Sequence, residues 1–133
     1  MQNIFVLDSF AVLAFLGNEK GRDQVSRLLH EAADHKAVIL MSVINLGEVW
    51  YQIARDFSFD RADEIVAELI GFEIEMVGVD WALARQSAVF KAKGGISYAD
   101  CYTAALAKAR NATVVTGDKE FKRVENEVKI LWL

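Results

Sequence analysis

Four acidic residues occupy positions that a role as surface charges explains poorly when they are considered together. Asp8 follows an apolar run directly, in FVLDSF, and Asp118 follows a β-branched run, in VVTGDKEF. Asp100 falls early in an Ala-rich segment, ISYADCYTAALA, and Glu48 is the one acid in the apolar segment SVINLGEVWY. Two strand ends and two helix positions can converge on one rim of a sheet. The sequence therefore predicts a single carboxylate site.

Carboxylates gathered within several ångströms repel one another, which raises some of their pKa values and favours a bound cation. Mg²⁺ and Mn²⁺ prefer oxygen ligands, and Mg²⁺ usually takes one or two carboxylates and keeps waters for the rest. Such an ion activates water and neutralises the charge that develops on a phosphodiester. The pattern thus predicts metal-assisted phosphoryl chemistry. Ser9 and Thr116 are candidates to orient a carboxylate or a phosphate oxygen from nearby.

Each acid also has a structural explanation of its own. Asp8 and Asp118 could cap the helix or turn that follows each of them. Asp100 stands three residues after Ser97, which is close to a capping-box arrangement and favourable to the helix dipole. Glu48 could face solvent. Both interpretations stay open for each residue, and the joint occurrence of the four favours a site.

Composition limits the class of protein. The chain has 133 residues, 53% of them apolar, and it has no proline or linker-like tract, so we expect one domain over residues 1–133. No apolar run approaches the roughly 20 residues of a membrane helix, and no basic segment precedes the first apolar run, so we expect neither a membrane span nor a signal peptide. A lone Cys101 excludes an internal disulfide and suits the cytoplasm. The formal net charge of −4 opposes binding of nucleic acid by bulk positive charge.

The spacing of apolar residues predicts alternating strands and helices. Short apolar runs indicate strands, and stripes at i, i+3, i+4 and i+7 indicate helices. This alternation predicts an α/β layer fold with a mostly parallel sheet. The expected strands are residues 4–7, 37–41, 74–79, 113–116 and 129–133, and the expected helices are 11–16, 25–33, 43–53, 62–70, 82–93 and 97–110, with one helical turn at 119–122.

Four motifs in order, FVLDSFAVLAFL, SVINLGEVWYQI, ISYADCYTAALA and VVTGDKEF, resemble those of PIN-domain proteins, and more narrowly the VapC toxins of toxin–antitoxin pairs. The resemblance covers most of the chain, although residues 56–79 carry no family-specific signature. It implies a PIN-like three-layer fold, with a central, mostly parallel sheet flanked by helices. It also implies a site that binds Mg²⁺ or Mn²⁺ through Asp8, Glu48, Asp100 and Asp118, with Ser9, Asn45 and Thr116 in supporting roles.

The same resemblance implies endoribonuclease activity, a homodimer and inhibition by a cognate antitoxin, whose groove would involve residues 25–33 and 46–57. Hydrolysis by a metal-activated water predicts products with a 5′-phosphate and a 3′-hydroxyl. Because the 2′-hydroxyl is then not the nucleophile, a preference for RNA must come from shape or strand contacts. Candidate phosphate contacts, each also explicable as solubilising charge, are Lys91, Lys93, Lys119, Lys122 and Arg123.

Other functions were compared with this one. A phosphatase of the haloacid dehalogenase type needs two aspartates separated by one residue after the first strand, but Ser9 and Phe10 follow Asp8. A response-regulator receiver fits the pattern poorly as well. A non-catalytic PIN-like module that binds RNA or a protein remains the alternative to an enzyme. Three aromatic residues could stack on bases, but core or partner-facing positions explain them equally well: Trp50, Tyr51 and Phe57.

Overall fold

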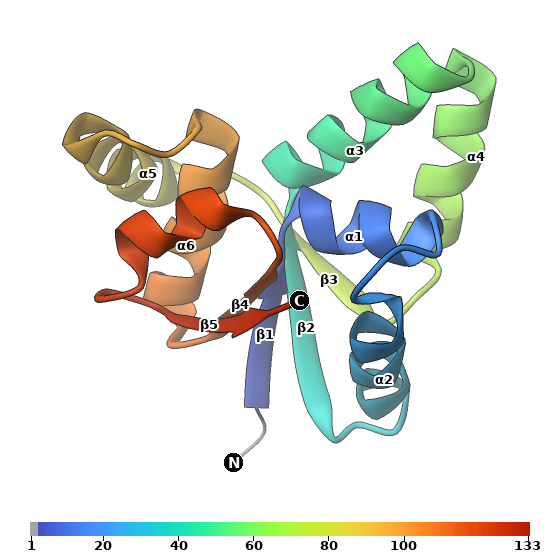
Figure 1. Cartoon of the computed structure of the whole chain (residues 1–133), viewed down its shortest axis with the longest axis horizontal. Coiled ribbons are helices and arrows are strands. Elements are labelled where there is room, and N and C mark those ends of the chain that lie inside the picture. Colours follow the sequence, from blue (N-terminus) through green and yellow to red (C-terminus); the bar gives the residue numbers. More distant parts are fainter. Residues whose placement is uncertain (1–2) are drawn as a thin grey trace.

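The computed structural model of the chain describes residues 3–133 and shows a parallel α/β domain (Figure 1). The strands are β1 (Asn3–Leu7), β2 (Ala37–Ser42), β3 (Ile74–Val77), β4 (Thr113–Thr116) and β5 (Lys129–Trp132). The α-helices are α1 (Ser9–Leu16), α2 (Arg22–Ala33), α3 (Val43–Asp56), α4 (Phe59–Ile70), α5 (Trp81–Lys93) and α6 (Tyr98–Arg110), and η1 (Lys119–Val124) is a 3₁₀ helix.

The five strands form one sheet in the order β3-β2-β1-β4-β5, and all four pairings are parallel. Helices α5 and α6 lie on one side of this sheet and α1 to α4 on the other (Figure 1). The predicted α/β fold, with a central parallel sheet flanked by helices, is therefore confirmed.

Several predicted boundaries are wrong by two or three residues, and the caps explain why. Helix α1 begins at Ser9 and α4 at Phe59, before their apolar stripes, because a stripe marks the buried positions and the cap marks the start. Strand β3 ends at Val77 and not at residue 79. The chain turns there toward α5, whose cap Asp80 accepts a hydrogen bond from the backbone N–H of Leu83 (2.9 Å).

Successive residues of the central strands enter two different cores. Val6 and Val114 pack with α5 and α6, whereas Leu7 and Val115 pack with α1 to α4. This burial on both faces explains why the strands are continuous apolar runs. Helix α6 is buried from residue 100 to residue 107, yet no helix within residues 3–133 is long and apolar enough to cross a membrane.

The strand order reverses between β1 and β4, and this reversal determines where a ligand can bind. From β1 the chain passes to β2 on one side, while β4 and β5 extend the sheet on the other. The carboxyl ends of neighbouring parallel strands form a crevice at such a switch point. Leu7 is paired with Val115, so Asp8 and Thr116 follow side by side at that crevice.

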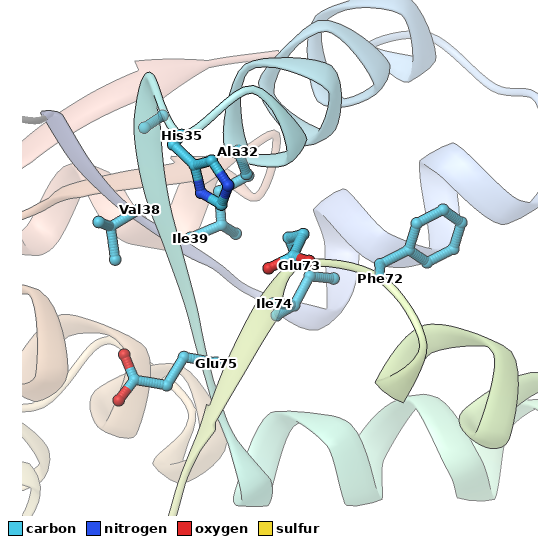
Figure 2. A pocket seen from close by; sticks show the side chains of 9 residues that line it. Ala32, His35, Val38, Ile39, Phe72, Glu73, Ile74 and Glu75 are labelled. Carbon is cyan, nitrogen blue, oxygen red and sulfur yellow. The ribbon is translucent and has the colours of Figure 1, made fainter.

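A pocket of about 320 Å³ lies at the opposite end of the sheet, around the first residues of β2 and β3. Figure 2 shows His35, Glu73 and Phe72 among the side chains that line it. The strands are parallel, so their first residues lie at one end of the sheet and their carboxyl ends, with the switch point, lie at the other. Substitutions in this pocket can therefore serve as controls.

The core contribution of η1 can be tested with two phenylalanines. Phe121 is fully buried in η1, and Phe57 is 75% exposed at the end of α3. We expect Phe121→Ala to lower the free energy of unfolding by about 3–5 kcal/mol through the cavity it leaves. We expect Phe57→Ala to change it by less than about 0.5 kcal/mol. Equal losses in urea unfolding would show that η1 is not part of the core.

Candidate active site

Asp8 lies at the junction of β1 and α1, where it is fully buried. Its Oδ1 accepts a hydrogen bond from the backbone N–H of Ala11 (2.8 Å) and its Oδ2 accepts a short one from the Thr116 hydroxyl. Burial raises the pKa of Asp8 to about 7, against the lowering effect of these two hydrogen bonds. The negative charges of Asp118 and Glu48 raise it further. Asp8 is thus both the helix cap and a member of a carboxylate cluster.

Thr116 connects the ends of β1 and β4. Its side chain is fully buried, and its Oγ1 donates to Asp8 while accepting a hydrogen bond from the backbone N–H of Asp118 (2.9 Å). The Asp118 carboxylate in turn accepts from the backbone N–H of Glu120 (2.9 Å) and caps η1. One hydroxyl therefore fixes the relative positions of two of the predicted acids.

Asp100 lies in the first turn of α6 and is only 4% exposed. Burial raises the pKa of Asp100 to about 8, and the charges of Asp8 and Asp118 raise it as well. Asp100, Asp118 and Glu120 each present an oxygen, and these three atoms lie within 4.8 Å of one another. The structure thus brings carboxylates from α6 and from the end of β4 into one cluster.

Glu48 lies on α3 and is half-buried, and its Oε1 accepts a hydrogen bond from the Ser9 hydroxyl (2.5 Å). One turn earlier on α3, Asn45 is fully buried. Its Nδ2 donates to the backbone oxygen of Ala99 (3.2 Å) and its Oδ1 accepts from the Thr103 hydroxyl (2.9 Å). Asn45 therefore attaches α3 to α6 and holds Glu48 near the other acids.

An open pocket of about 440 Å³ exposes this cluster to solvent. Asp8 is buried behind it, close enough for the charges of Asp118 and Glu48 to act on its carboxyl group. The residues that line the pocket are Ser9, Phe10, Leu13, Ala14, Glu19, Glu48, Gln52, Ser97, Asp100, Asp118 and Glu120.

Glu120 belongs to the cluster, and the sequence analysis missed it. Its Oε1 accepts a hydrogen bond from the backbone N–H of Ser97 (2.9 Å), the residue that caps α6. In a capping box this N–H would bond to the side chain three residues later, which here is Asp100. Here Glu120, which lies in η1, accepts this hydrogen bond instead of Asp100. The available signal was its position two residues after Asp118 in VVTGDKEF.

The predicted lysine contacts lie outside the pocket. Lys91 donates to the backbone oxygen of Ile96 (3.1 Å), and Lys93 forms an ion pair with Glu127 (3.2 Å). Lys119 is exposed beside Asp118, and no lysine or arginine occurs among the described residues that line the pocket. A role of these lysines in phosphate binding stays a prediction.

The donor groups of the cluster fit a hard divalent cation. They are carboxylate and hydroxyl oxygens, which Mg²⁺ and Mn²⁺ prefer, and the raised pKa values of Asp8 and Asp100 reflect burial and repulsion that a cation would relieve. The chain is thus a parallel α/β domain with an acidic cluster, consistent with a metal site, at the switch point of its sheet. The PIN domain family model matches residues 5–127, and the chain belongs to the PIN domain family.

Solved structures of toxin–antitoxin complexes contain chains with this fold. A chain of the DNA-bound VapBC complex from Salmonella typhimurium matches with a TM-score of 0.76 at 20% identity, over 98% of both chains. A chain of VapBC2 from Rickettsia felis, bound to a promoter DNA fragment, gives 0.74 at 20% identity over 98% of both. VapC20 from Mycobacterium tuberculosis, described as a toxin that cleaves the sarcin-ricin loop, gives 0.67 at 22% identity over 90% of this chain and 93% of its own. No curated protein sequence matches the chain.

The metal-free protein should lose stability as the pH rises from about 4 to about 8. Asp8 and Asp100 have folded-state pKa values of about 7 and about 8, both above the ordinary value of 3.8. In this window the folded protein binds more protons than the unfolded chain, so the free energy of unfolding falls with rising pH. The loss is on the order of 1.4 kcal/mol for each unit by which a folded-state pKa exceeds the unfolded value. Urea unfolding in EDTA at a series of pH values measures it.

Two variants control this experiment. Asp100→Asn removes one of the two buried titrating groups and should flatten the pH dependence and raise stability at pH 8. Asp34→Asn changes an exposed aspartate at the end of α2 and should keep the slope of the unaltered protein. A free energy of unfolding that stays constant or rises across this window would contradict the burial of the two carboxyl groups.

The bond from Glu120 to Ser97 can be separated from the Glu120 charge by comparing two substitutions. Both Glu120→Gln and Glu120→Ala remove the charge, but only Gln retains an oxygen that accepts from the Ser97 N–H. We expect Glu120→Ala to be less stable than Glu120→Gln by about 1 kcal/mol, the usual contribution of one hydrogen bond. Equal stabilities in urea unfolding would show that the bond contributes nothing.

Proposed function

We propose that this protein is a Mg²⁺- or Mn²⁺-dependent endoribonuclease, and that it is the toxin of a type II toxin–antitoxin system. The convergence of Asp8, Glu48, Asp100 and Asp118 at the switch point of a PIN-domain sheet carries this proposal. The fold shared with VapC toxins supports it, since one of these, VapC20, is described as a toxin that cleaves the sarcin-ricin loop.

In this proposal Asp8, Asp100 and Asp118 hold the cation, and Glu48 completes the negatively charged wall of the site. Bound there, Mg²⁺ or Mn²⁺ would act as a Lewis acid on the phosphodiester and lower the pKa of water. Thr116 and Ser9 keep two of the carboxylates in place through their hydroxyl groups. Asn45 serves the same purpose at one remove, because it attaches α3 to α6.

The reaction proposed is hydrolysis. The oxygen of a water molecule attacks phosphorus, the P–O3′ bond breaks, and the products carry a 5′-phosphate and a 3′-hydroxyl. Glu48, which is half-buried and hydrogen-bonded to Ser9, is placed to accept the proton that the water loses. A proton from solvent completes the 3′-hydroxyl. The ribose 2′-hydroxyl takes no part in this chemistry.

The partners proposed are a cytoplasmic RNA, a second copy of the chain and an antitoxin. Crystallised neighbours in VapBC complexes support the antitoxin. A second pocket, largely apolar and of about 490 Å³, also supports an antitoxin partner. It lies beside the acidic pocket and is bordered by α1, α3 and α4. Its lining includes Leu13, Leu16, Ile53, Phe57 and Ile65, and so falls partly within the predicted groove at residues 46–57.

The proposal is tested by incubating the purified protein with cellular RNA in Mg²⁺, in Mn²⁺ and in EDTA. We expect cleavage in either metal, none in EDTA, and 5′-phosphate ends on the fragments. Asp8→Asn and Asp100→Asn should lower the rate by about 100-fold or more, the usual cost of removing one group that stabilises the transition state.

Asp34→Asn, far from the pocket, should cleave like the unaltered protein, and circular dichroism should show that all the variants are folded. Cleavage that persists in EDTA, or in both active-site variants, would overturn the proposal. Folded, metal-saturated protein that cleaves no RNA would favour the non-catalytic alternative.

A further inference from the structure

Phe10 is the only aromatic residue among the described residues that line the acidic pocket, and it is 42% exposed. It lies in the first turn of α1, between the capping residue Asp8 and the interior of the helix. We propose that its ring is a stacking platform for an unpaired nucleotide base beside the scissile phosphate. This inference rests on the proposed ribonuclease function.

The backbone of Gly117 holds the ring in place. A Cβ atom at position 117 would overlap the Cε1 and Cζ atoms of Phe10, so the ring occupies the space that the missing side chain leaves. The backbone of Gly117 is not left-handed. Glycine is therefore needed here because it has no Cβ, and not because of its conformational freedom. Because Gly117 lies between Thr116 and Asp118, the ring is packed against the segment that carries the carboxylates.

The charges of the pocket favour a contact that does not depend on positive charge. Five of its lining residues are acidic, and none of its described residues is a lysine or an arginine. Phosphate groups therefore gain little attraction from the pocket walls themselves. Stacking of a base on an aromatic ring needs no positive charge and accepts every base, because each has a π-face.

The other aromatic candidates are engaged elsewhere. The Trp50 indole donates to Asp63 (2.8 Å) and packs against Phe59, with ring centroids 5.1 Å apart. Tyr51 lies under the Arg55 guanidinium, and Phe57 borders the neighbouring apolar pocket. Among the described residues that line the acidic pocket, Phe10 is the aromatic one, and it can contact a base next to a phosphate at the carboxylates.

A base can stack on Phe10 only if it has left its own helix. In a duplex both faces of each base are covered by neighbouring bases, whereas single strands, loops and ends can splay a base outward. The platform thus selects unpaired nucleotides and leaves base identity largely unread.

Binding tests this inference without requiring cleavage. In the Glu48→Gln background with Mg²⁺, which lacks the proposed proton acceptor but keeps Asp8, Asp100 and Asp118, fluorescence anisotropy compares a short single-stranded RNA of mixed sequence with the same strand annealed to its complement. We expect tighter binding of the single strand, and about a 10-fold loss on Phe10→Ala, equivalent to about 1.4 kcal/mol. Phe10→Trp should retain the affinity. Phe72→Ala is the matched control, because Phe72 is also 42% exposed but lines the pocket at the other end of the sheet (Figure 2).

Two further readouts distinguish stacking from a structural effect. The ratio of affinities between the parent and Phe10→Ala should stay constant as salt is raised, because stacking releases no counterions. A scan of single abasic substitutions should find one position that weakens binding to the parent by about 10-fold and has no effect on Phe10→Ala, since the two changes remove the same contact.

Equal affinity of the parent and Phe10→Ala, preference for the duplex, or no binding of the single strand by the parent would each overturn the inference. Equal affinity would assign Phe10 to a protein partner. Failure of the ribonuclease proposal looks different, because base-dependent binding would persist in a protein that shows no metal-dependent cleavage.

Discussion

The parallel pairing of β1 with β4 forces carboxylates together at a buried place. The register that opposes Leu7 and Val115 brings Asp8 next to Thr116, and Asp118 follows two residues later. Asp8 has no exposure to water and keeps its position through hydrogen bonds from a hydroxyl and a backbone N–H. Both contacts stabilise its charged form, yet burial outweighs them and its pKa stays raised. The fold thus holds acids where they ionise with difficulty, and a bound divalent cation would relieve the repulsion between them.

Hydrogen bonds to side chains, and not ion pairs, connect the helices that complete the site. Asn45 attaches α3 to α6 through two bonds in a buried position, and Glu120 attaches η1 to the cap of α6. The ion pairs among the described residues lie outside the acidic pocket. Glu127, for example, pairs with Lys93 and Lys108. A lysine inside the cluster would neutralise the acids and compete with a metal, so this separation of charge preserves the affinity of the site for cations.

Most of the fold could be predicted because apolar runs and stripes report burial directly. The starts of α1 and α4 could not be placed from their stripes, since those helices begin after the polar caps Asp8 and Ser58, which precede the first apolar residue of each stripe. Glu120 was not predicted as a member of the acidic cluster. Its place there depends on a hydrogen bond between η1 and Ser97, which lies 23 residues earlier in the chain. The place of Phe10 was equally hidden, since it depends on Gly117, which is distant in sequence and reveals its role only by having no side chain.

The acidic pocket also explains how a chain with a net charge of −4 could act on a polyanion. The described residues that line this pocket include no lysine or arginine, and Lys93 is paired with Glu127. In the proposed site, binding energy would come from a cation held by the carboxylates and from the Phe10 ring at the rim. Neither the cation nor the ring is selective alone, because a metal binds any phosphate and a ring stacks on any base. A ligand that contacts both the cation and the Phe10 ring needs a phosphate and an unstacked base on adjacent nucleotides. A flexible single strand can offer both, whereas the bases of a duplex are stacked.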